Sequence, residues 1–143
     1  MLELMYTWAK ILHAGKGALW RRRLHQELIL KTEFIADSEV KYYLCAADAV
    51  VQPYRNATQS GVTPLAYHFE IPMIVTNVGG LPAFVPHGKV GLVCEPTVDS
   101  ITAAMQQYMQ TGSEQFLPHL REEKKKYGWD KMTAAVLQLA ASV

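Results

Sequence analysis

The side chains best suited to bind a ligand gather in one polar stretch, residues 54–63, directly after a buried apolar run. This stretch carries hydroxyls, amides and the guanidinium of Arg55, and it has no acidic side chain. Ser60 and Gly61 stand where a helix is predicted to begin. A helix start offers free amide hydrogens and a positive dipole end to a phosphate, and glycine lets the anion approach the backbone. The stretch therefore predicts a phosphate site, although Ser60 or Thr63 could equally serve only as a helix cap.

Patterns typical of catalytic and metal sites are missing from the sequence. His68 and His87 each lack a Cys, Asp or Glu at ligand spacing, and Ser60 lacks the glycine two positions earlier that a hydrolase nucleophile requires. No pair of carboxylates is placed for acid–base work. Asn77–Gly80 is a second glycine turn at a strand end, which by itself is a weak sign of binding. We therefore assign no catalytic residue and expect neither a metal ion nor another cofactor.

Short apolar runs alternate with helical patterns from Lys31 onward. The expected strands are Glu33–Ile35, Ala49–Gln52, Met73–Thr76 and Val90–Cys94. The expected helices are Ser38–Ala47 with Asp37 as its cap, Thr63–Phe69, Ser100–Met109 with Asp99 as its cap, Glu114–Tyr127 and Asp130–Ala141. Apolar strands separated by helices indicate an α/β fold, a parallel sheet with helices on both faces. Such sheets bind ligands at the carboxyl ends of their strands, where the polar stretch is expected to lie.

Charge sets the first 30 residues apart. The 143-residue chain has a net charge of +1, whereas residues 1–31 carry six basic and two acidic side chains, a net +4. Apolar residues recur there at helical spacing, so we expect a helical segment at 1–30 and a folded domain at 31–143. The cluster Arg21–Arg23 could attach the chain to an anionic membrane surface, but a solvated helix face is the commoner origin of such a cluster.

The near balance of charge over the whole chain excludes a strongly basic nucleic-acid-binding protein. No apolar run approaches the roughly 20 residues of a membrane-spanning helix, and no secretory signal pattern opens the chain. Two cysteines, Cys45 and Cys94, are too few for a disulfide framework or a zinc site. We expect a cytoplasmic protein, peripheral at the inner face of the membrane only if its basic cluster binds lipid.

Four blocks of sequence occur in an order that is more specific than any one of them. They read AADAVVQP from Ala46, AYHFEIPMIVTNVGGL from Ala66, AFVPHGKVGLVCEP from Ala83 and EEKKKYGWDKM from Glu122. In this order they resemble the C-terminal half of the GT-B glycosyltransferases, the large retaining family of glycosyl transferases group 1. The resemblance covers roughly residues 31–140. It implies a Rossmann-like domain that binds a nucleotide diphosphate sugar as the donor.

The resemblance also implies which loops meet that donor. The loop after the first expected strand, with Ile35 and Ala36, would face the nucleobase, and the loop Thr58–Thr63 would face the donor sugar and the diphosphate. With Arg55 as the nearest cation, the implied donor-binding residues are Ile35, Ala36, Arg55, Thr58, Gln59, Ser60, Gly61, Val62 and Thr63.

The sequence departs from the family pattern in three respects. The family places two acids in the second loop and its helix. Their positions here are Ala57 and Leu65, or Thr58 and Ala66 with a shift of one residue. Neither alignment supplies a carboxylate, and the polar Gln59 and Thr63 are the candidates to replace them. In addition, residues 1–30 do not resemble the first strands of the half-domain, and the N-terminal acceptor domain is missing.

Two functions of different classes follow from these observations. The first is the donor-binding domain of a glycosyltransferase, which transfers a sugar from a nucleotide diphosphate sugar when the full two-domain enzyme is present and is inactive alone. The second is a non-catalytic interaction or oligomerisation module in which residues 1–30 cover an open sheet edge or pair two chains. The missing acids favour the second function, and the intact Gln-Ser-Gly sequence at 59–61 favours the first.

Overall fold

The structure, a computed structural model, describes residues 32–142, so the helical segment expected at residues 1–30 lies outside the described residues. Its centre is a parallel sheet of β1 (Val50–Gln52), β2 (Met73–Thr76) and β3 (Gly91–Cys94), in the order β1-β2-β3. Every residue of β2 is buried, which is typical of a central strand covered on both faces. The expected α/β class with a parallel sheet is confirmed.

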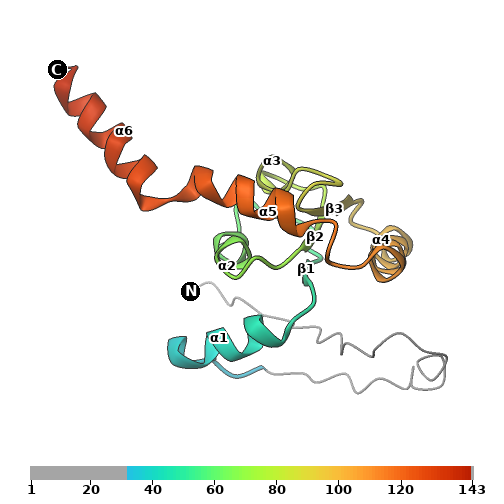
Figure 1. Cartoon of the computed structure of the whole chain (residues 1–143). Helices are drawn as coiled ribbons and strands as arrows, with labels where there is room; N and C mark the ends of the chain where they lie inside the picture. Colours follow the sequence, from blue (N-terminus) through green and yellow to red (C-terminus); the bar gives the residue numbers. More distant parts are fainter. Residues whose placement is uncertain (1–31, 143) are drawn as a thin grey trace.

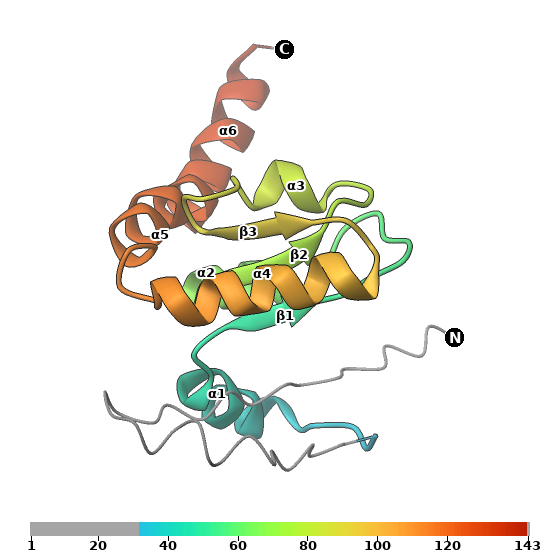
Figure 2. The same ribbon diagram turned by 90° about the vertical axis from the view of Figure 1, so that its right-hand side faces the viewer.

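Helices cover both faces of this sheet. Figure 1 shows α4 (Val98–Thr111) on one face, and α2 (Val62–His68) and α5 (Leu117–Lys124) on the other. Figure 2, turned by 90°, shows α4 crossing in front of the strands and the short α3 (Leu81–Phe84) beside β3. The helices on both faces expected from the alternating pattern, and the Rossmann-like domain that the resemblance implied, are therefore confirmed.

The other helices lie outside these layers. α1 (Asp37–Ala46) precedes β1, lies beyond the outer edge of that strand and contributes the buried Leu44 to the core. The 3-10 turn η2 (Lys125–Tyr127) follows α5 and leads into α6 (Trp129–Ala141). Both views show α6 projecting away from the sheet, and all of its residues are exposed. Within residues 32–142 no helix combines the length and the apolar character needed to cross a bilayer.

The core joins the sheet to α4 and α5. Phe116 and Leu120 are fully buried in one cluster with Met73 of β2, and Phe116 stacks on Tyr108 of α4 with ring centroids 5.9 Å apart. The Tyr108 hydroxyl donates a hydrogen bond to the main-chain oxygen of Asp48, just before β1. One tyrosine therefore ties the helix on one face to the entry of the first strand.

The prediction of a strand at Glu33–Ile35 is wrong. These residues precede α1 without forming a strand, Phe34 is 90% exposed, and β1 pairs only with β2 among residues 32–142. A short apolar run becomes a strand only where a neighbouring strand can take its backbone hydrogen bonds, and no strand of the described part of the chain does so for Glu33–Ile35. The third parallel strand is instead β3, which lies within the expected run Val90–Cys94.

The five expected helices are confirmed, with different ends. Asp37 and Asp99 lie inside the first turns of α1 and α4, where their charge still complements the helix dipole, but neither caps its helix. The cap of α4 is Thr97, whose Oγ1 accepts a hydrogen bond from the Ser100 N–H at 3.3 Å.

Two further differences concern proline. The helix expected from Glu114 begins at Leu117, with Pro118 in its first turn, and it ends in the 3-10 turn η2. α3 was not expected, although Pro82 directly after the turn at Gly79–Gly80 is a signal for a helix start. The expected glycine turn itself is confirmed.

Candidate functional site

Three loops leave the carboxyl ends of the strands at one edge of the sheet. They span residues 53–61 after β1, 77–80 after β2 and 95–97 after β3. Parallel strands bring these ends together, so the polar stretch after β1 lies where ligands bind in folds of this class. The polar stretch therefore lies at the carboxyl ends of the strands, as the sequence predicted.

The first two loops touch through their backbones. The Gly80 N–H donates to the Thr58 carbonyl oxygen at 3.0 Å. Gly79 has a φ of +52°, and a Cβ added to it would lie 1.6 Å from the Ala57 carbonyl oxygen. Only glycine permits both this backbone conformation and this approach. The glycine turn after β2 therefore packs directly against the backbone of the polar loop.

Further hydrogen bonds fix the strand ends to one another. Thr76, the last residue of β2, donates its hydroxyl to the Tyr54 carbonyl oxygen at 2.6 Å. The Asn77 N–H donates to the Cys94 carbonyl oxygen at 2.7 Å, and its side-chain Nδ2 donates to Glu95 Oε1 at 3.1 Å. These hydrogen bonds therefore hold the three loops together at the carboxyl ends of the strands.

The start of α2 combines a side-chain hydrogen bond with open space. Ser60 Oγ accepts a hydrogen bond from the Val62 N–H at 3.2 Å, although the N-cap residue of α2 is Gly61 and not Ser60. Gly61 has a φ of −64°, and a Cβ added to it would meet no atom within 4 Å. A ligand can therefore approach the backbone at Gly61 without displacing any described part of the protein.

The other candidate residues of the loop divide by exposure. Arg55, Thr58 and Gln59 are exposed on the sheet edge. Val62 and Thr63 are buried in the first turn of α2, and their N–H groups already donate to Ser60, at 3.2 Å to Oγ and at 3.3 Å to the carbonyl oxygen. Since the Thr63 hydroxyl accepts a hydrogen bond from buried Gln52 at 3.3 Å, it is not a surface substitute for a missing acid.

Ile35 and Ala36 lie apart from these contacts. Ala36 is the N-cap residue of α1, and its carbonyl oxygen accepts hydrogen bonds from the N–H groups of Glu39 and Val40. Figure 2 shows this segment next to α1, on the outer side of β1. In the described part of the chain, no hydrogen bond joins either residue to the polar loop. The proposed contact of these two residues with a nucleobase stays a prediction.

Sequence reasoning missed Gln52, Thr76 and the pair Asn77–Glu95. Gln52 and Thr76 are buried polar residues that close the apolar strands β1 and β2. The signal was available, because a polar residue at the end of an apolar run lies at the ligand-binding edge of a parallel sheet. Glu95 supplies a carboxylate at this edge, although from the third loop and not from the second.

The thiol at this edge is unsuited to nucleophilic chemistry. Burial raises the pKa of Cys94, and the neighbouring charge of Glu95 raises it further, so the reactive thiolate is disfavoured. Among residues 32–142, no group of three or more His, Cys, Asp or Glu residues could hold a metal ion. The expectation of a site without a metal stays a prediction.

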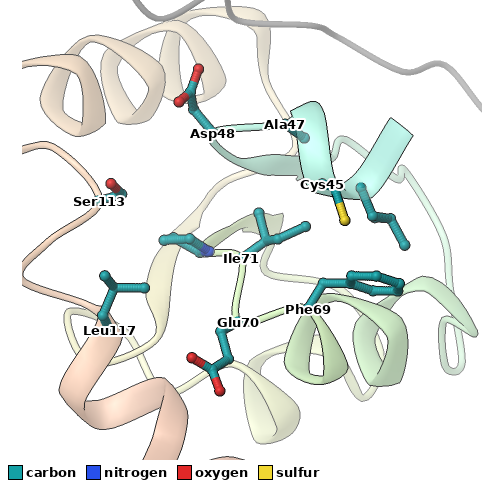
Figure 3. Close-up of a pocket in the computed structure, with 10 residues that line it drawn as sticks. Cys45, Ala47, Asp48, Phe69, Glu70, Ile71, Ser113 and Leu117 are labelled. Atoms are coloured by element: carbon teal, nitrogen blue, oxygen red, sulfur yellow. The ribbon is translucent and has the colours of Figure 1, made fainter. Parts of the chain in front are cut away.

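A separate hollow of about 170 Å³ lies at the opposite edge of the sheet, where the strands begin (Figure 3). It is lined by Leu44, Cys45, Ala47, Asp48, Phe69, Glu70, Ile71, Pro72, Ser113 and Leu117. Glu70 on its rim pairs with Arg121 at 2.9 Å and Lys124 at 3.4 Å. None of the predicted site residues lines this hollow, so it is not part of the candidate site.

Comparison with known protein families finds one whose sequence model matches most of this chain. The sequence model of the family described as glycosyl transferases group 1 matches residues 5–111. The match begins at Met5, so the similarity to the family starts earlier in the chain than the expected residues 31–140. It ends at Thr111, before the fourth block of resemblance at Glu122–Met132.

A solved structure shares the fold. Sucrose-phosphate synthase from Thermosynechococcus elongatus matches with a TM-score of 0.68 and 21% sequence identity over 87% of this chain. The matched part is 33% of that protein, so this chain spans about a third of the length of its structural relative. No curated protein sequence is significantly similar to the chain.

Proposed function

Because the chain belongs to the glycosyl transferases group 1 family, we propose that its described domain binds the nucleotide diphosphate sugar donor of a glycosyl transfer reaction. The acceptor would be bound by another domain, and this chain alone would not turn over. The observation that supports donor binding most directly is the polar loop itself, which lies on the carboxyl edge of the sheet with open space at Gly61.

The exposed residues of the loop have complementary roles in this proposal. The diphosphate would lie against the backbone at Gly61, with Arg55 gripping it through paired charge-assisted hydrogen bonds. Thr58 and Gln59 would offer neutral polar groups to the sugar. Such a site works by positioning the donor and stabilising the leaving diphosphate, and we assign no catalytic residue.

The test is a calorimetric or NMR titration with UDP and with GDP, on the wild type and on Gly61→Val. The open space at Gly61 and its ordinary φ predict that Gly61→Val folds normally, while its side chain blocks the phosphate. Arg55→Ala should weaken binding by about ten- to a hundredfold, the usual effect of losing a charged hydrogen bond. Ala134→Val, on exposed α6, adds similar bulk far from the loop and should leave the affinity unchanged.

Unchanged affinity in a folded Gly61→Val variant would place the nucleotide elsewhere. A complete lack of binding at millimolar nucleotide would favour the alternative, an interaction module derived from a glycosyltransferase. Two observations support that alternative: β1 has an edge without a partner strand among the described residues, and α6 exposes Trp129, Val136 and Leu139.

A further inference from the structure

Gln52, the last residue of β1, carries a buried polar atom without a partner. Its side chain is 3% exposed, and its Nε2 donates to Thr63 Oγ1 at 3.3 Å. Its main-chain oxygen accepts a hydrogen bond from the Thr76 hydroxyl at 3.4 Å. The remaining amide atom, Oε1, has no hydrogen-bond partner among the described residues. The amide nitrogen of Gln52 therefore has a hydrogen-bond partner, whereas its amide oxygen has none among the described residues.

Such an atom is costly to keep. A carbonyl oxygen removed from water without a hydrogen bond lowers the stability of the folded state, whereas an apolar side chain of similar shape would avoid that cost. Buried unsatisfied groups are rare in native proteins, so each one calls for an explanation. Leucine at this position would extend the apolar run of β1, so the glutamine calls for an explanation beyond packing.

The location of Gln52 supplies this explanation. Gln52 ends its strand at the carboxyl edge of the sheet, between that edge and the first turn of α2, next to the loop that the proposed function assigns to the donor. We propose that Gln52 Oε1 accepts a hydrogen bond from a hydroxyl of the bound nucleotide sugar, either on the ribose or on the transferred sugar. This inference rests on the proposed function. It assigns Gln52 to hydroxyl recognition, because a phosphate oxygen is itself an acceptor and cannot pair with Oε1.

The burial of Oε1 adds a requirement, because a hydroxyl can reach it only when neighbouring residues move, and the loop 53–61 directly follows Gln52. The ends of that loop are held by the Thr76 hydroxyl on Tyr54 and by the Gly80 N–H on Thr58, while Arg55 and Asn56 between them are exposed. Binding of a nucleotide sugar should therefore shift the NMR resonances of Tyr54 and Thr63 more than binding of inorganic diphosphate does.

The experiment compares Gln52→Leu with the wild type in the full chain, with Gln106→Leu on exposed α4 as the matched control. The ligands are UDP-glucose, GDP-mannose, UDP and inorganic diphosphate. Gln52→Leu removes the unsatisfied Oε1 but also takes the donor from the buried Thr63 Oγ1, so the two effects oppose each other and we expect little change in the melting temperature. Gln52→Leu should weaken the nucleotide sugar about tenfold and leave diphosphate binding unchanged, and Gln106→Leu should alter neither. If Gln52→Leu also weakens the binding of UDP, the hydroxyl lies on the ribose. If it weakens only the binding of the nucleotide sugars, the hydroxyl lies on the transferred sugar.

Three results would overturn the inference, each with a different meaning. Equal affinities for the nucleotide sugars in Gln52→Leu and the wild type would show that Gln52 makes no contact with them. An equal loss for inorganic diphosphate would show that Gln52 only positions the loop. If the wild type binds none of the ligands, the proposed function fails, and this inference fails with it. Gln52→Met, which preserves the side-chain length, replaces Gln52→Leu if the latter does not fold.

Discussion

Gly79 and Gly80 both bring the first two loops into contact, and Gly79 makes the closer approach. Its positive φ and the close approach of the Ala57 carbonyl oxygen leave no room for a side chain. Gly79→Ala should therefore destabilise the domain by about 2 kcal/mol or more and displace the polar loop. Chemical denaturation measures the stability, and amide chemical shifts of residues 57–60 report the loop.

Gly88 provides the matched control for this prediction. It also has a positive φ, +76°, but a Cβ added to it would meet nothing within 4 Å. Gly88→Ala should therefore cost only the backbone strain, about 1 kcal/mol, and leave the loop in place. Equal effects of the two substitutions would mean that the contact with Ala57 does not position the loop.

At the residue scale, the sequence predicted the exposed part of the site better than its buried part. Ser60, Gly61 and the two neighbouring glycines were recognised because turn and cap chemistry is local. Thr63 was a candidate to replace a missing acid, but its place in the first turn of α2 directs its side chain to the core. The bond from Gln52 to Thr63 joins a strand to a helix, so its geometry depends on packing that no local pattern specifies.

At the scale of elements, the end of α2 carries an unusual residue. The Ile71 N–H donates to the Ala66 oxygen at 2.9 Å and the Glu70 N–H to the Tyr67 oxygen at 3.2 Å, the two bonds of a Schellman motif. The left-handed position of this motif normally holds glycine, but here it holds Glu70 with a φ of 57°. A hydrogen bond from Arg121, aided by Lys124, lowers the pKa of Glu70 and connects the end of α2 to α5.

Comparing two substitutions separates backbone strain from ion pairing at this position. Glu70→Gln keeps the strain and loses the charge, whereas Glu70→Gly loses both. Glu70→Gly should therefore be more stable than Glu70→Gln by about 1 kcal/mol in chemical denaturation. The ion pairs are exposed, so the gap between the wild type and Glu70→Gln should be small and should narrow further at high salt. A Glu70→Gln variant at least as stable as Glu70→Gly would contradict the assigned strain.

Elements were predictable where their signals were local and strong. The helices and the buried strands β2 and β3 follow from periodicity and apolar runs, and prolines and glycines mark their limits. The run Glu33–Ile35 failed because a strand is defined by its neighbour, and the preceding sequence gave no indication of which segment would pair with it. The cap at Thr97 was missed because Asp99 is an equally good cap by residue type, and only the backbone conformation decides between them.

At the scale of the whole molecule, Tyr108 links stability to pH. Burial, together with a smaller effect of the nearby Asp48, raises the pKa of its hydroxyl from the ordinary value of 10.0 to about 12. The folded state therefore holds this proton more tightly than the unfolded chain does. This contribution is complete below about pH 10, and it is lost as the pH rises through about 12. Unfolding measured across this range should show stability falling by about 2 kcal/mol from this group.

Tyr108→Phe tests the assignment. The variant should be less stable at neutral pH, because the hydrogen bond to the Asp48 carbonyl is lost, but its stability should fall less steeply at alkaline pH. Some decline should persist, since burial also raises the pKa of Tyr67. An alkaline decline identical to that of the wild type would mean that Tyr108 is not responsible.

The position of α6 has a consequence for how the molecule unfolds. An isolated helix of this length is marginal in water, and α6 contacts η2 while leaving all its own residues exposed. Its free energy of opening is therefore smaller than that of the sheet, where β2 is wholly buried. Within residues 32–142, amide hydrogens of α6 should therefore exchange with solvent through local fraying, whereas those of the central strand should exchange only when the domain opens as a whole.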